Sequence, residues 1–432
     1  MKAVRIIILF GLLLVTLACN HEEVDTPNKT FFKVFNSEIE YIARQVLQKV
    51  DGTILVLAIA NEEIGQSAFF GTRRSELLVY TASGDFVKEL ILPEEVHAAH
   101  GMVLLKSDAV LVFGYDKEAR SSTVGLVRIG NSLEVDLVST FNNNMGVGEI
   151  TTGLDFNQIK ATVFENGNIV LSLVQFSPNV FSFAGYYTRL VIFDESLNIL
   201  NSAFYNGDPS ERPFPIRSTR PSRVQELANR NIAYPVIQRI NQEEQRALLI
   251  EIDFNTLDSV SSFDLNPLAD IVSSKFVISP SGDAYFPGIS FGSDEPPASS
   301  YRIRNLETIE LYQDFSAYAM QDDDVVELNL SGLPSLIGVV DVAGTSDGGA
   351  VFLGICNMLE STNLVSNSRM FIAKISPDQS VDWIETISTG RPIYPGSIIQ
   401  VADGFLISST GISTQNQFQI NLIKTDKNGK IN

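Results

Sequence analysis

A pair of turn signals recurs along the chain after residue 30 and constrains its fold more than any other feature. The first signals of the pairs are separated by 52 to 66 residues and lie at Asp51-Gly52, Ser107-Asp108, Asn166-Gly167, Asn229–Asn231, Ser281-Gly282, Asp347–Gly349 and Asp403-Gly404. Most are followed by a β-prone apolar run, such as residues 53–57 or 109–113. Asp-Gly and Asn-Gly between such runs indicate β-hairpins, because tight turns need residues that tolerate positive φ.

A second turn signal follows later in each unit. These signals lie at Ser83–Asp85, Gly130-Asn131, Asp194–Ser196, Asp253–Asn255, Asn305–Glu307, Ser376–Asp378 and Lys427–Gly429. Each unit therefore contains four predicted strands in two hairpins, which is typical of a β-propeller blade. We predict an all-β chain in which residues 30–432 form a single propeller domain of seven four-stranded blades. The least regular unit lies between residues 265 and 335.

The two ends of this repeat predict how the ring closes. The last unit stops at Ile431-Asn432, so its fourth strand is missing, whereas Phe31–Phe35 lies upstream of the first unit without a partner in it. We expect this N-terminal strand to complete the last blade and so to remove an open sheet edge. Residues 38–48 have a second interpretation as a helix, because their apolar residues are at near-helical spacing. We favour a strand, since these residues occupy the first-strand position of the repeat.

The first 29 residues are typical of an export signal followed by a tether. Lys2 and Arg5 precede an apolar run over residues 6–18, which is too short to span a bilayer as a helix. The run ends at Cys19 after Thr16-Leu17-Ala18 and resembles a bacterial lipobox, although the family pattern prefers Leu at the position of Thr16. The resemblance implies a signal peptide over 1–18 and a lipidated, palmitate-bearing Cys19. Residues 19–29 then form a flexible acidic tether. The alternative is an ordinary secretory signal.

The last two units carry a further resemblance. Residues 347–355, 370–383 and 421–431 are similar to repeats in large β-propeller lipoproteins of Bacteroidota, and the acidic stretch after Cys19 resembles the surface-export signal of such lipoproteins. The resemblance implies a lipoprotein of the bacterial outer membrane and, through the acidic stretch, exposure at the cell surface. Because most such proteins have no assigned function, it indicates fold and compartment more than activity.

Composition excludes several classes of function. The chain has 51 acidic and 31 basic residues and a net charge of −20, which argues against a nucleic-acid partner. Its two Cys and three His cannot form a disulfide framework or a Cys-rich zinc site. His97 and His100 are spaced i,i+3, but zinc needs three or four ligands. We therefore predict no metal, no cofactor and no catalytic motif, and we expect Trp383 to pack between blades rather than to stack on a sugar.

One set of residues points to a binding site. Near the start of the first strand, five successive units carry a cation or a histidine: Arg44, His100, Lys160, Arg223 and Lys275. The sixth and seventh units have Ile337 and Gly396 there. First strands line the channel of a propeller, so these side chains would form an anion-binding funnel at one mouth. The alternatives are pairing with neighbouring acids, or a register error of one residue, which would turn a side chain to the other face.

These observations favour a lipid-anchored cell-envelope binding or scaffold protein without catalytic activity. It would act through loops on one propeller face, such as 61–75, 205–223 and 356–369, with a protein or glycan partner. One alternative is an extracellular hydrolase or lyase for a polymer such as an acidic glycan, with its site at the channel. Another is a structural subunit of an envelope complex. Fold alone does not decide among them, because propellers host many activities.

Overall fold

The computed structural model of the chain describes most of the repeat region. The described residues are 30–61, 73–116, 123–142, 159–176, 186–205, 223–239, 245–264, 277–278, 284–287, 299–304, 308–314, 336–357, 369–378, 380–389, 391, 393–415 and 417–431. They form 28 strands and one short 3-10 helix. Within this part of the chain, no helix is long and apolar enough to cross a membrane.

The strands follow one another in chain order with short connections. The first half of the chain contains β1 (Phe31–Phe35), β2 (Glu40–Gln48), β3 (Ile54–Asn61), β4 (Arg73–Tyr80), β5 (Phe86–Ile91), the helix η1 (Glu94–Val96), β6 (Ala98–Leu104), β7 (Val110–Tyr115), β8 (Thr123–Ile129), β9 (Val135–Asn142), β10 (Ile159–Val163), β11 (Ile169–Phe176), β12 (Tyr186–Phe193) and β13 (Ile199–Tyr205). The second half contains β14 (Gln225–Glu226), β15 (Ile232–Arg239), β16 (Gln245–Ile252), β17 (Ser259–Asp264), β18 (Val277–Ile278), β19 (Ala284–Pro287), β20 (Ser299–Arg304), β21 (Thr308–Asp314), β22 (Leu336–Gly344), β23 (Ala350–Asn357), β24 (Arg369–Ile375), β25 (Val381–Ile387), β26 (Ile393–Val401), β27 (Gly404–Ile412) and β28 (Phe418–Thr425).

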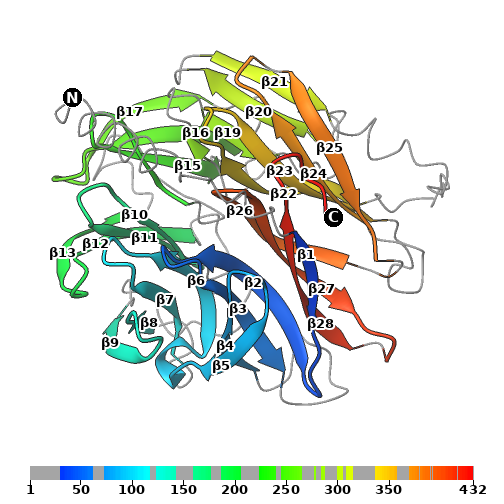
Figure 1. Ribbon diagram of the computed structural model, residues 1–432. Helices are drawn as coiled ribbons and strands as arrows, with labels where there is room; N and C mark the ends of the chain where they lie inside the picture. Colours follow the sequence, from blue (N-terminus) through cyan, green and yellow to red (C-terminus); the bar gives the residue numbers. More distant parts are fainter. Residues whose placement is uncertain are drawn as a thin grey trace, which may run out of the picture.

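These strands pair into seven antiparallel four-stranded sheets (Figure 1). Six sheets contain four consecutive strands, and the seventh has the order β1-β28-β27-β26. Packing contacts join consecutive sheets through their first strands, as in the contacts of β22 with β26, of β26 with β2, of β2 with β6 and of β6 with β10. The predicted all-β propeller is therefore confirmed. The alternative helix over residues 38–48 is wrong, because most of that segment forms β2.

The hairpins that join first to second and third to fourth strands share one turn geometry. In eight of those described, the first of five residues donates its backbone N–H to the carbonyl of the fifth, and its own carbonyl accepts from the N–H of the fourth, which has positive φ: 49–53, 81–85, 105–109, 130–134, 164–168, 194–198, 227–231 and 345–349. Residues 426–430, which follow β28, form the same turn. This is a type I turn followed by a left-handed residue. Gly52, Gly167 and Gly348 fill that position without a Cβ clash, as the predicted turn signals require.

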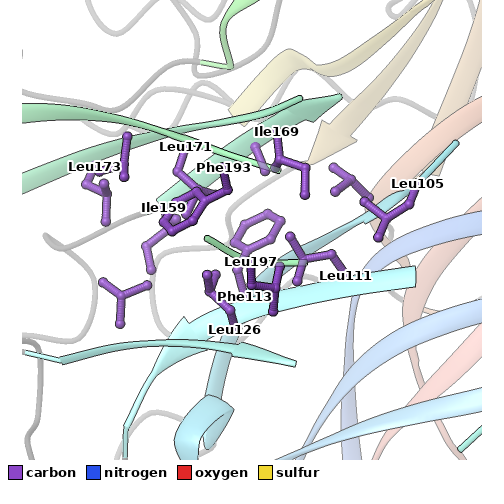
Figure 2. Close-up of a cluster of buried hydrophobic side chains, with 14 of the residues drawn as sticks. Leu105, Leu111, Phe113, Leu126, Ile159, Ile169, Leu171, Leu173, Phe193 and Leu197 are labelled. Atoms are coloured by element: carbon purple, nitrogen blue, oxygen red, sulfur yellow. The ribbon is translucent and has the colours of Figure 1, made fainter. Parts of the chain in front are cut away.

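The second strand of a blade is buried on both faces. In β7, Leu111 and Phe113 pack toward β10–β13, whereas Val110 and Val112 pack toward β2–β5. Figure 2 shows the first of these clusters, in which Phe113 lies close to Phe193 of the neighbouring sheet. A strand with neighbours on both faces therefore has a continuous apolar sequence rather than alternation, because both sets of side chains leave water.

The N-terminal strand completes the sheet that contains the C-terminal strands. Phe31 of β1 lies opposite Lys424 of β28, and Phe35 lies opposite Ile420. The Phe31 ring is 8% exposed and packs so closely against Gly84 that a Cβ there would lie 2.6 Å from the ring. The predicted closure of the last blade by residues 31–35 is confirmed.

Candidate functional site: the central channel

The first strands of the sheets surround a cavity of about 350 Å³. Its lining includes residues of β2, β6, β10, β18, β22 and β26, together with Arg223, which lies two residues before β14. Six sheets and Arg223, just before β14, therefore contribute to one cavity. The folded ring brings together side chains that lie 54 to 64 residues apart in sequence, as a propeller channel does.

Four of the five residues predicted for the funnel line this cavity. They are Arg44, His100, Lys160 and Arg223, and they come from four consecutive sheets. We call these four residues the cationic arc. The fifth predicted residue, Lys275, lies outside the described residues, as does the predicted lipidation site Cys19.

The first strands reach the channel by two backbone arrangements. Arg44 is the extra residue of a β-bulge, because Ala43 and Gln45 pair with consecutive residues of β3. His100 is the extra residue of the corresponding bulge in β6. Lys160, in contrast, pairs regularly with Ser172 of β11. A bulge re-aims side chains locally, which explains how both arrangements supply the same channel.

The register corrects one predicted equivalence. In β22 the bulge lies at Val340, between the pairs formed by Val339 and Asp341. Ile337 pairs with Cys356 three residues earlier, so it is not the counterpart of Arg44. Gly396 is the extra residue of the bulge in β26 and does occupy the corresponding place. The predicted alignment of this unit was three residues out of register, since Val340 lies eight residues before Gly348, as Arg44 lies eight residues before Gly52.

Burial and neighbouring charge keep His100 neutral. Desolvation, with the positive charges of Arg44 and Lys160, lowers the pKa of the His100 imidazole to about 3. The pKa of Arg223 is also lowered, chiefly by desolvation, while the charge of Asp341 opposes that shift. The Arg223 side chain retains exposed area because it faces the cavity, yet it is surrounded by protein.

The described lining carries a positive net charge. Arg44, Lys160 and Arg223 contribute three positive charges and Asp341 one negative charge, which leaves a formal +2 in a chain whose total is −20. Low-dielectric walls concentrate such a field within a channel. The arrangement can therefore attract an anion at a place where the protein as a whole repels one.

Asp341 lies on the wall formed by β22 and is held in place by backbone donors. Its side chain is buried, its Oδ1 accepts from the N–H of Val342 at 2.9 Å, and its Oδ2 accepts from the N–H of Ile398 at 2.9 Å. Next to it in the ring, Ser397 Oγ accepts from the N–H of Val46 at 2.8 Å. Asp341 and Ser397 were not among the residues predicted from the sequence. The available signal for Asp341 was a polar residue within an otherwise apolar first strand.

The histidine pair shows no metal site among the described residues. His100 packs edge-to-face on Tyr115, with ring centroids 5.2 Å apart, whereas the His97 carbonyl accepts from Ser75 Oγ at 2.8 Å. No group of three His, Cys, Asp or Glu residues in the described chain is placed to hold a metal ion. The two histidines therefore have separate surroundings.

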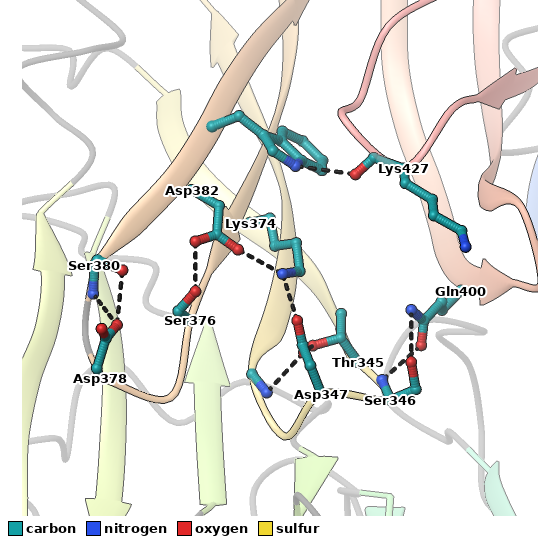
Figure 3. Close-up of polar contacts among 12 residues, drawn as sticks. Thr345, Ser346, Asp347, Lys374, Ser376, Asp378, Ser380, Asp382, Gln400 and Lys427 are labelled. Atoms are coloured by element: carbon teal, nitrogen blue, oxygen red, sulfur yellow. Dashed lines mark hydrogen bonds and ion pairs between the residues drawn. The ribbon is translucent and has the colours of Figure 1, made fainter.

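A second cavity, of about 660 Å³, lies between β22–β25 and the closing sheet. Figure 3 shows that Lys374 Nζ bridges Asp347, at 2.6 Å, and Asp382, at 2.5 Å. Trp383 Nε1 donates to the Lys427 carbonyl at 3.1 Å, and its ring packs edge-to-face on Phe405. Trp383 thus joins two sheets, as expected. These polar groups bind one another, so the first cavity is the better candidate site.

Comparisons with known proteins do not extend this assignment. No family model and no curated protein matches the chain. Among solved structures, the chain is similar to a protein of unknown function from Dyadobacter fermentans, with 10% identity, a TM-score of 0.46 and coverage of 91% of this chain and 97% of that one. It is also similar to the propeller domain of the trilobed protease from Pyrococcus furiosus, with 11% identity, a TM-score of 0.45 and coverage of 90% and 100%. A third similar structure is the polysaccharide lyase Uly1, with 9% identity, a TM-score of 0.44 and coverage of 92% and 99%.

Proposed function

We propose that this protein is a non-catalytic binding protein of the bacterial cell envelope that holds an acidic ligand in its central channel. The observation that carries the proposal is the convergence of Arg44, Lys160 and Arg223 on one cavity of net positive charge. Arg guanidinium groups bind carboxylates and phosphates through a rigid fork, and Lys adds a point charge. An anion entering the channel would gain all of these interactions together.

The size of the cavity limits what it can hold. A volume of about 350 Å³ is near the lower end of the range for ligand pockets, roughly 300–1,000 Å³. It suits a small acid or a single acidic unit of a larger molecule. A protein partner would present such a group on a side chain or on an attached glycan.

The channel chemistry favours binding over glycoside hydrolysis. Glycosidases generally use two carboxyl groups on either side of the scissile bond. The described lining holds one carboxyl group, that of Asp341, and its two oxygens accept backbone hydrogen bonds. A single carboxylate held in this way resembles a recognition group more than one half of an acid–base pair.

The envelope location rests on the sequence. The apolar run over residues 6–18 and the small residue before Cys19 support processing to a lipidated N-terminus. Metabolic labelling with an alkyne-bearing palmitate analogue tests this directly in the full chain. Label that is lost in Cys19→Ala is the expected result, and label that persists in that variant would contradict it.

Anion binding is tested on the purified ring by calorimetry and thermal shift at fixed ionic strength. The probes are acetate, sulfate and D-glucuronate. At least one should bind wild type, and Arg223→Met should weaken that binding about tenfold or more, because a charged hydrogen-bond partner is lost. Lys33→Met is the matched control, since Lys33 is exposed and pairs with Asp85 outside the channel. Binding that is equal in both variants, or no binding of any probe, would overturn the proposal.

A further inference from the structure

The channel has two chemically different walls. The cationic arc comes from four consecutive sheets, from β2–β5 to β14–β17. The remaining three sheets contribute Val277, Asp341 and Ser397 among their lining residues. We call this second wall the acceptor arc. A ligand spanning the cavity therefore meets positive charge on one side and a carboxylate with a hydroxyl on the other.

Asp341 determines which groups the acceptor arc tolerates. An ionised carboxylate accepts hydrogen bonds and donates none, so it attracts hydroxyl or amine donors. It repels a second negative charge, and the repulsion is stronger in a desolvated channel than in water. Backbone bonds from Val342 and Ile398 hold both of its oxygens, so the group cannot turn away from the cavity without breaking them.

An apolar acid would offer the acceptor arc no hydrogen-bond donor. A carboxylate has about four lone-pair sites, so a hydroxyl against Asp341 can bond to it in addition to the backbone donors, whereas a hydrocarbon cannot. Phe113 and Met102 also line the cavity and can contact the face of a ring. The lining thus combines an anion-attracting side, an acceptor side and some apolar contact, as ligand pockets commonly do.

We propose that the ligand is a polyhydroxylated monocarboxylate, namely a sugar acid, whose carboxylate faces Lys160 and Arg223 and whose hydroxyls face Asp341. This inference rests on the proposed function and adds the class of ligand to it. Asp341 is then a specificity-determining residue. The sugar acid is either a free molecule or one unit of an acidic polysaccharide, since both present the same groups.

A series of three ligands tests the inference on wild-type protein. D-glucuronate carries the carboxylate and the hydroxyls, cyclohexanecarboxylate keeps the ring and the charge, and D-glucose keeps the hydroxyls. Calorimetry at about pH 7 should find D-glucuronate bound about tenfold or more tightly than either of the others, because sites built for a hydroxyl reject analogues without it. A glucuronate oligosaccharide separates the two sources, since tighter binding than the monomer supports a polymer and equal binding supports the free acid.

Asp341→Asn tests the role of that residue. It should weaken D-glucuronate binding about tenfold and leave cyclohexanecarboxylate binding unchanged or tighter, because repulsion is removed while no hydroxyl contact is lost. Circular dichroism and thermal melting establish whether the variant folds. If it does not fold, the wild-type ligand series still decides the question.

The outcomes separate this inference from the proposed function. Equal affinity for D-glucuronate and cyclohexanecarboxylate, with binding that still depends on Arg223, would overturn the sugar-acid inference and leave anion binding in place. Binding of neither acid, together with no binding of sulfate, would overturn both. Equal affinity for D-glucose and D-glucuronate would also overturn both, because the charge of the ligand would then be irrelevant.

Discussion

Asp341 Oδ2 accepts the backbone N–H of Ile398 in the next sheet of the ring at 2.9 Å. The same relation recurs in the two following sheets. Ser397 Oγ accepts from Val46 N–H at 2.8 Å, and Gln45 Oε1 accepts from Met102 N–H at 2.9 Å. In each case, the residue after the bulge in one first strand binds the backbone of the next. Polar side chains at the channel therefore join neighbouring blades as well as facing the cavity.

Ser397→Ala should destabilise the ring by about 1–3 kcal/mol, because the N–H of Val46 would be buried without an acceptor. Urea unfolding measures the loss. Ser83→Ala is the control, since Ser83 lies in an exposed turn and its hydroxyl bonds to Asp85 within that turn. A loss at Ser397 no larger than that at Ser83 would contradict the inter-sheet role.

Phe31→Ala should lower the free energy of unfolding by about 3–5 kcal/mol, because it removes the buried ring through which the closing strand β1 packs against the first blade. Val34→Ala, on the same strand but 39% exposed, should cost clearly less. Thermal melting and limited proteolysis near the N-terminus measure both variants. If the two variants were equally stable, the closing strand would not be held by the packing of Phe31.

Trp383→Phe should destabilise the protein by about 1 kcal/mol, since it removes the hydrogen bond to the Lys427 carbonyl and keeps an aromatic ring beside Phe405. Gly429→Ala should destabilise the protein more than Trp383→Phe does. Its Cβ would lie 2.5 Å from the indole, and its φ of +78° disfavours a side chain. Chemical unfolding of the two single variants and the double variant should show non-additive losses, because the two residues are in contact. Additive losses would indicate that the two sites are independent.

Asp347 should stabilise the protein in a pH-dependent way. Desolvation raises the pKa of its carboxyl group, but hydrogen bonds from Lys374 and Thr345 outweigh it and lower the pKa to about 2. The resulting stability is present above the unfolded pKa of 3.8 and is lost as the pH falls toward about 2. The side chain is 48% exposed, so the effect is about 1 kcal/mol at most.

Comparison of wild type with Asp347→Asn tests this dependence. The difference in free energy of unfolding between them should shrink as the pH is lowered from about 5 to about 2. High salt should reduce the difference at the upper pH, because partly exposed charges are screened. A difference that does not change with pH would indicate that the carboxylate charge contributes nothing.

His100 should oppose folding in weakly acidic solution. Its folded-state pKa of about 3 lies below the unfolded value of 6.5, so the unfolded chain binds the proton first. Stability contributed by the neutral imidazole is therefore full above about pH 6.5 and decreases as the pH falls toward 3. His100→Asn should lose less stability than wild type over this range. An NMR titration of the imidazole that shows a midpoint near 6 would contradict the expected shift.

The sequence alone predicted the repeat and the hairpins, because these depend on local chemistry, and it predicted the ring closure because residues 31–35 had no partner in the first unit and the last unit lacked a strand. In Asp-Gly and Asn-Gly turns the glycine, such as Gly52 or Gly167, adopts positive φ whatever the distant sequence is. The apolar runs after these turns have few alternatives to strands. It also predicted that Arg44 and Lys160 would occupy similar positions. It did not predict that one of them is a bulge residue and the other a regular pair.

Only the tertiary structure decided the composition of the channel. The pairing of β22 with β23 places the counterpart of Arg44 at Val340, three residues after the predicted Ile337. Asp341, the residue after this bulge, lines the cavity. The residues that share this cavity come from segments separated by more than 50 residues, and the repeat pattern indicated Arg44, His100, Lys160 and Arg223 but not Asp341 or Ser397. Their meeting is fixed by the closure of the ring, which is a property of all the sheets together.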